Sequence, residues 1–77
     1  MKKQDVIKIL EEEYFYQREN YDNYYKQNDK ICNFYYGGMI AVISIYSALN
    51  NSITHDQAKV ILTKAYYEHI QNKEVKK

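Results

Sequence analysis

Residues 31–54 have the sequence ICNFYYGGMIAVISIYSALNNSIT and contain no charged side chain. Apolar residues lie on every side of a helix drawn over residues 30–49. This pattern is typical of the buried central helix of a bundle or of a membrane span. We expect the former, with charged helices on either side covering it in water.

Four small residues share one narrow side of this helix. They are Gly37, Ala41, Ser44 and Ala48, spaced four, three and four residues apart. Small side chains allow another backbone to approach closely. The spacing therefore predicts a close-packing seam, and we expect Ala41→Leu to overpack it and destabilise the fold by ~1–3 kcal/mol.

The residues that follow carry the signals of a helix end and a new helix start. Asn50 or Asn51 can adopt the left-handed conformation that ends a helix. Thr54 then caps the next helix, and Gln57 completes a capping box. These signals predict an αα-hairpin that leads into a third helix over residues 55–71.

The N-terminal segment predicts a long amphipathic helix over residues 5–28, separated from the next helix by a cap at Asn28 or Asp29. Its apolar stripe, interrupted only by Gln17, consists of Val6, Ile7, Leu10, Tyr14, Tyr21, Tyr24 and Tyr25. Phe15 and Tyr16 project from the opposite, charged side. Aromatic residues are enriched at interface hot spots, so we interpret Phe15, Tyr16 and Tyr24 as candidate contacts for a partner.

The third predicted helix has more apolar surface than one intramolecular contact needs. Ala58, Ile61, Leu62, Ala65 and His69 form one stripe. Val60 and Tyr67 lie on another side, and we interpret them as further candidates for partner binding. Residues 72–77 are expected to form a disordered tail.

The sequence thus predicts an all-α fold, a three-helix bundle with a long N-terminal helix and an αα-hairpin. The alternative is α-β-β-α. Residues 31–36 and 39–46 are rich in β-branched and aromatic residues, and Gly37-Gly38 suits a hairpin turn. We prefer the helix because an isolated two-stranded hairpin has little stability of its own.

With 77 residues the chain has room for one domain, residues 1–77, whose core is small. Its single cysteine, Cys32, cannot form an internal disulfide, which favours a reducing, cytoplasmic setting. The start of the chain lacks a signal-peptide core. Self-association as a homodimer would supply the missing stabilisation.

No constellation of catalytic or metal-binding residues is evident in the sequence. His55 and His69 stand fourteen residues apart, and neither has a metal-ligand neighbour on its own helix face. Cys32 has no flanking group that would activate its thiol. We therefore expect no enzyme activity, no metal and no cofactor.

Two alternative functions remain. The segments Tyr24-Tyr25-Lys26 and Lys64-Ala65-Tyr66-Tyr67 combine rings with bases, as in proteins that bind nucleic acid. The net charge of +1 does not favour that partner. Residues 31–49 are also long enough for a single membrane span.

The favoured function is protein–protein binding without catalysis. Lysine outnumbers arginine ten to one, and the chain is rich in Asn, Ile and Tyr, residues with AT-rich codons. The sequence therefore suggests a phage or mobile element of an AT-rich bacterium. We expect an accessory protein or inhibitor that binds a larger host protein and occludes it.

Overall fold

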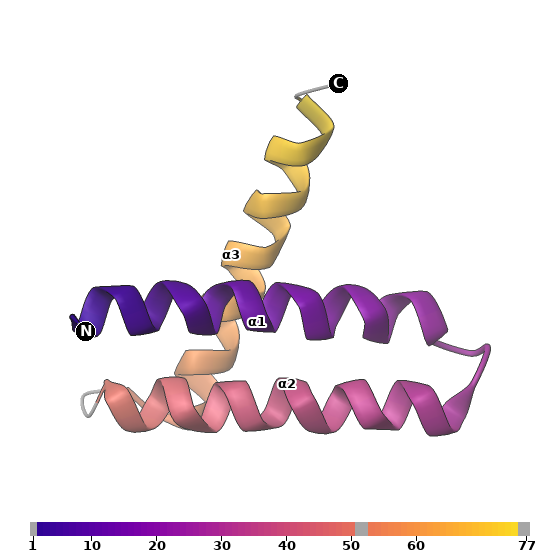
Figure 1. Cartoon of the computed structure of the whole chain (residues 1–77), viewed down its shortest axis with the longest axis horizontal. Helices are drawn as coiled ribbons and strands as arrows, with labels where there is room; N and C mark the ends of the chain where they lie inside the picture. Colours follow the sequence, from indigo (N-terminus) through magenta and orange to yellow (C-terminus); the bar gives the residue numbers. More distant parts are fainter. Residues whose placement is uncertain (1, 51–52, 76–77) are drawn as a thin grey trace.

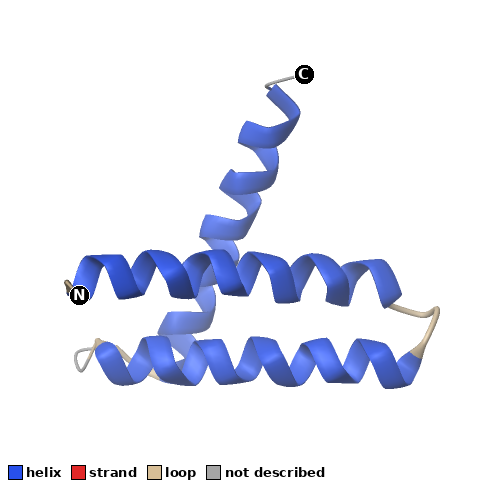
Figure 2. Cartoon of the chain, viewed as in Figure 1, coloured by secondary structure: helices blue, strands red, loops and turns tan. Residues whose placement is uncertain are grey.

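The chain forms three α-helices in the computed structural model, which describes residues 2–50 and 53–75 (Figures 1 and 2). They are α1 (Lys3–Tyr24), α2 (Asp29–Leu49) and α3 (His55–Val75). Over the described ranges no strand is present, so the all-α prediction is confirmed. The α-β-β-α alternative is wrong, because Gly37 and Gly38 continue one helix and neither has a positive φ.

The turn between α1 and α2 begins earlier than the sequence predicts. α1 ends at Tyr24 and not at residue 28, because Lys26 adopts the left-handed conformation with a φ of 65°. The amides of Gln27 and Asn28 both donate to the Tyr24 carbonyl, at 3.0 and 3.1 Å. Asn28 then caps α2, since its side chain accepts a hydrogen bond from the amide of Ile31 at 3.1 Å.

The capping box at the start of α3 is confirmed. The Gln57 amide donates to the Thr54 hydroxyl at 3.1 Å, and the Thr54 amide donates to the Gln57 side chain at 2.8 Å. Asn50 does not take the left-handed conformation (φ −112°). It ends α2 through its amide, which reaches the carbonyls of Tyr46 and Ser47 at 3.2 Å. Asn51 lies outside the described residues.

The C-terminal helix is longer than the sequence predicts. α3 continues through residues 72–75, which were expected to be disordered. Neither Gly nor Pro interrupts this segment, and Lys73 in the last turn complements the negative end of the helix dipole. Residues 76 and 77 lie outside the described part.

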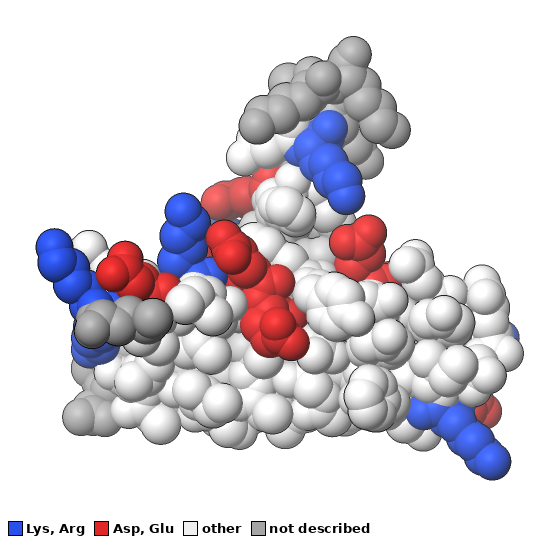
Figure 3. Space-filling view, viewed as in Figure 1, with Lys and Arg blue, Asp and Glu red and all other residues white. Residues whose placement is uncertain are grey.

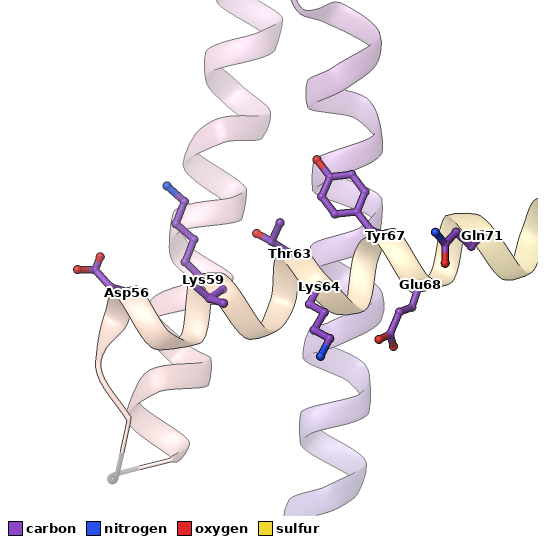
Figure 4. Close-up of a pocket in the computed structure, with 8 residues that line it drawn as sticks. Asp56, Lys59, Thr63, Lys64, Tyr67, Glu68 and Gln71 are labelled. Carbon is purple, nitrogen blue, oxygen red and sulfur yellow. The ribbon is translucent and has the colours of Figure 1, made fainter.

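The three helices form an antiparallel pair crossed by a third. α1 and α2 lie side by side, whereas α3 crosses both at a steep angle and projects beyond α1 (Figures 1 and 4). The Cα radius of gyration is 13.1 Å, against about 11–12 Å for a compact chain of this length. The projecting half of α3 accounts for the larger value.

The core lies where the three helices meet. Tyr14, Ala58 and Leu62 have exposed fractions of 0 %, and Ile43 has 1 %. The other buried members of this cluster are Leu10, Met39, Val42, Tyr46 and Tyr66. Cys32 is also buried, and its thiol lies 3.8 Å from the Tyr21 carbonyl.

α2 is covered on one side only, which corrects the expectation of a fully enclosed helix. Because α3 crosses steeply, it cannot run along the second side of α2. Ala41 and the other small residues of the predicted seam are exposed, and a methyl group built on Gly37 would meet no atom within 4 Å. The predicted seam is thus not a contact within the chain, and Ala41→Leu would meet no helix of the same chain there.

Close packing occurs instead one residue further along, at Gly38. A methyl group there would collide with the side-chain amide of Gln17 on α1. Gln17 donates from Nε2 to Glu13 at 2.9 Å, while its Oε1 is buried and has no hydrogen-bond partner among the described residues. The one polar residue in the α1 stripe is thus the one that lies over the glycine.

Phe15 is not an exposed anchor, because α3 covers it. Its ring stacks on His69 with centroids 4.6 Å apart and lies 6.1 Å from the ring of Tyr66. Phe15 is half-buried and packs against the core cluster. Its neighbour Tyr16 remains 55 % exposed, so the two adjacent aromatics have different roles.

We expect Phe15→Ala to lower the free energy of unfolding by about 1–3 kcal/mol, less than the 3–5 kcal/mol typical of a fully buried phenylalanine. Chemical denaturation followed by circular dichroism measures this change. Tyr16→Ala is the matched control and should change stability by less than about 1 kcal/mol. Equal stability of Phe15→Ala and the unmodified chain would contradict the contact between α1 and α3.

Candidate functional site: the outer face of α3

α3 presents one face to the core and the opposite face to solvent. Ala58, Leu62 and Tyr66 are buried. On the other side, Val60 is 67 % exposed and Tyr67 is 52 % exposed. A seven-residue separation places these two side chains on the same face, two turns apart.

A shallow hollow of about 750 Å³ runs along this exposed face. Figure 4 shows its lining, which comes entirely from α3: Asp56, Lys59, Val60, Thr63, Lys64, Tyr67, Glu68 and Gln71. We call this set the α3 outer face. A smaller hollow of about 370 Å³ adjoins it, shares Asp56 and Val60, and extends to Ile53 and Ile61.

The charged groups of the α3 outer face carry both signs. Lys59 and Lys64 are balanced by Asp56 and Glu68. The α3 outer face therefore attracts neither a strongly acidic nor a strongly basic partner. Apolar contact with Val60 and Tyr67 at its centre does not depend on the partner's charge. The arrangement suits a ligand with an apolar strip and mixed charges at its edges.

Arg18 of α1 holds Tyr67 in place. Its Nη2 donates to the Tyr67 hydroxyl at 3.2 Å, and the guanidinium lies 5.7 Å from the centre of the Tyr67 ring. The same guanidinium bonds Tyr14 and forms a 3.3 Å ion pair with Asp22. Tyr67 is thus exposed yet oriented, and orienting a ring in advance reduces the entropy lost on binding.

Tyr66, adjacent in sequence, points to the inside and titrates abnormally. Burial, followed by the negative charges of Asp22 and Glu19, raises the pKa of Tyr66 from 10.0 to about 12, with Arg18 opposing the shift. Its hydroxyl donates to Asp22 at 3.4 Å. The buried Tyr66 supports the helix crossing, while Tyr67 remains available at the surface.

The structure brings together two of the five partner-binding residues that the sequence suggests. Val60 and Tyr67 lie on the α3 outer face. Phe15 lies beneath α3. Tyr16 and Tyr24 lie against Tyr35 of α2, each with its ring centre 6.1 Å from that of Tyr35. These tyrosines pack the α1–α2 pair and do not extend the α3 surface.

Sequence reasoning missed Arg18 and Thr63. Arg18 is the chain's only arginine and stands four residues from both Tyr14 and Asp22, a spacing that allows the observed contacts. Thr63 binds the buried hydroxyl of Tyr14 at 3.3 Å. Only the crossing of α1 and α3, which the sequence does not specify, brings that pair together.

Among the described side chains we find no cluster of reactive groups that resembles a catalytic centre. Among them, no group of three His, Cys, Asp or Glu residues could hold a metal ion. Cys32 is buried. Tyr66, which a nucleic-acid interface would need for stacking, is only 4 % exposed and cannot accept a base on its ring face.

Comparison with known proteins yields no match. No protein-family model corresponds to the chain, and neither a curated protein nor a solved structure is significantly similar to it.

The raised pKa of Tyr66 predicts a loss of stability in alkali. Unfolded Tyr66 releases its proton near pH 10, whereas folded Tyr66 keeps it to about pH 12. The contribution is complete below pH 10 and is lost as pH rises to 12, by roughly 2 kcal/mol. Urea unfolding at several pH values measures the free energy of unfolding. Between pH 10 and 12 this free energy should fall less steeply for Tyr66→Phe than for the unmodified chain. Identical slopes would refute the assignment.

Proposed function

We propose that this chain is a small protein-binding module without enzymatic activity, and that the α3 outer face is its contact surface. The proposal rests on Val60 and Tyr67, which are 67 % and 52 % exposed and lie at the centre of the α3 outer face. Other described helices leave this face uncovered, and α3 projects beyond α1 (Figure 1). It is therefore sterically open to a large partner.

The partner we propose is a protein that presents an amphipathic helix. The α3 outer face spans residues 56–71, a straight strip of about 23 Å at 1.5 Å per residue. A helix of similar length can lay its apolar side over Val60 and Tyr67 while its polar edges meet the lysines and carboxylates. Tyrosine is a frequent hot-spot residue at such interfaces.

A module of this kind acts by covering a surface of its partner. This mechanism needs shape and apolar contact but no reactive group. It is compatible with an inhibitor or accessory protein of a phage or mobile element that occludes a larger host protein in the cytoplasm. The codon-biased composition supports that origin.

Photo-crosslinking at Val60 tests the proposal. We expect p-benzoylphenylalanine at position 60 to capture one specific protein in the native host, and the same probe at Lys8, exposed on α1, not to capture it. With that partner purified, Tyr67→Ala should weaken binding about tenfold or more. Tyr67→Phe, which keeps the ring but loses the hydrogen bond from Arg18, should bind more tightly than Tyr67→Ala and less tightly than the unmodified chain.

Two outcomes would overturn the proposed function. One is a crosslinked protein whose affinity is unchanged by Tyr67→Ala in a variant shown by circular dichroism to remain folded. The other is equal capture of the same protein at positions 60 and 8, which would place the contact elsewhere or make it nonspecific.

A second candidate function is that of a membrane protein, and it is supported by α2. This helix has 21 residues and contains an 18-residue window with a mean hydropathy of 1.3, and it is long and apolar enough to cross a membrane. Only 22 % of its apolar window is buried within the chain. Five of its side chains nevertheless pack inside the chain, among them Met39, Val42 and Ile43.

Fractionation without detergent distinguishes the two candidates. We expect the protein-binding module to stay in the supernatant after cell lysis and high-speed centrifugation. Ser44→Lys should leave this distribution unchanged, because Ser44 is exposed in the folded chain. Sedimentation with the membranes, reversed by a lysine in the middle of α2, would favour the membrane span.

A further inference from the structure

α2 presents an exposed, uncharged face opposite its contacts with α1 and α3. Phe34 is 72 % exposed and Ile45 is 50 % exposed. Between and beyond them lie the exposed small residues Gly37, Ala41 and Ala48. We call these five residues the α2 outer face. Figure 3 shows the surface over α2 free of charge along most of its length, with charged groups only where the helix begins.

We propose that a second copy of this chain packs antiparallel on the α2 outer face, about a two-fold axis at Ala41. The inference goes beyond the proposed function, because it uses a different helix and a different partner. An interface across a two-fold axis must be complementary to itself. The α2 outer face meets this requirement in both shape and charge.

The shape is self-complementary because large and small residues alternate at matching distances from Ala41. Phe34 stands seven residues before Ala41 and Ala48 stands seven after it. In the antiparallel pair Phe34 therefore lies level with Ala48 of the second copy, a large side chain over a small one. Ile45 lies level with Gly37 of the second copy, where space is open.

The charges are complementary in the antiparallel direction only. Lys30 is exposed at the start of α2, on the side of Phe34 and Ala41. The last turn of α2 contains no basic residue to offset the negative end of the helix dipole. In an antiparallel pair, Lys30 of each copy lies near the negative C-terminal end of α2 in the other copy. A parallel copy would place the two Lys30 side chains together.

The size of the face predicts a weak dimer. Residues 30–48 span about 27 Å, and a helix is about 10 Å wide. The footprint is therefore well below the ~800 Å² per partner of a standard stable interface. We expect a dissociation constant above ~1 μM, so the chain exchanges between one copy and two.

Sedimentation equilibrium over a range of concentrations tests the association. We expect a monomer–dimer equilibrium for the unmodified chain and a monomer only for Ala41→Glu, because two carboxylates would meet at the axis. Asn72→Glu adds the same charge on the projecting part of α3 and should still dimerise. Ala41 is exposed, so Ala41→Glu should keep the helical circular dichroism spectrum.

Disulfide trapping tests the antiparallel direction in a Cys32→Ser background. Ala41→Cys should crosslink rapidly, because the two cysteines meet at the axis. Ala48→Cys should not, because its two copies would lie about 21 Å apart. Crosslinking of Ala48→Cys, or sedimentation as a monomer at all concentrations, would overturn the inference.

Flotation of the same variants with phosphatidylcholine vesicles tests whether the α2 outer face binds a lipid surface instead of a second copy. We expect the unmodified chain to stay with the dense fraction. Flotation that Ala41→Glu abolishes would show that the α2 outer face binds lipid, and would overturn the dimer. Photo-crosslinking at Val60 is independent of either result, because Ala41→Glu leaves the α3 outer face intact.

Discussion

The burial of Tyr14 at the crossing of the three helices is the interaction on which the structure most depends. Its exposed fraction is 0 %, yet its hydroxyl is polar and must be satisfied there. Thr63 of α3 and Arg18 of α1 supply partners, each at 3.3 Å. Because Arg18 also reaches Tyr67, the same contact that seats α3 on α1 orients the exposed ring of the proposed binding face.

Because α3 crosses the other two helices steeply, it covers little of α2. A third helix laid alongside α1 and α2 would have hidden more of the uncharged segment. A steep crossing concentrates contact in a small region, with Ile43, Ala58 and Leu62 at its centre. The side of α2 that carries Phe34, Ala41 and Ile45 is left exposed. The exposure of the α2 outer face thus follows from one geometric feature, the angle at which α3 meets the other helices.

The sequence predicts the helices well because their determinants are local. The capping box of Thr54 and Gln57 depends on residues three apart, and it forms as expected. The stripe of α1 likewise predicts the burial of Leu10 and Tyr14. The end of α1 was misplaced because Lys26, a residue without special preference for the left-handed conformation, adopts it.

What the sequence could not give is the relation between helices. Periodicity tells which residues share a face, but it does not tell which face another helix covers. Phe15 lies on the charged side of α1, and only the position of α3 makes it a packing residue. The reverse applies to Gly37 and Ala41, which are exposed because α3 does not run along them. The exposure of Val60 and Tyr67 could be predicted because they lie opposite the buried stripe of their own helix.

The two proposed surfaces reinforce each other if both are used. Met39, Val42 and Ile43 of α2 share one buried cluster with Ala58 and Leu62 of α3, and none of the three belongs to the α2 outer face. Pairing through Phe34 and Ala41 therefore leaves both copies of Val60 and Tyr67 uncovered. A dimer then offers two binding faces to one large or repetitive partner, and the second contact forms at a high effective concentration. Two weak interfaces can in this way produce a tight complex that neither would give alone, and a partner with two sites would itself favour the dimer.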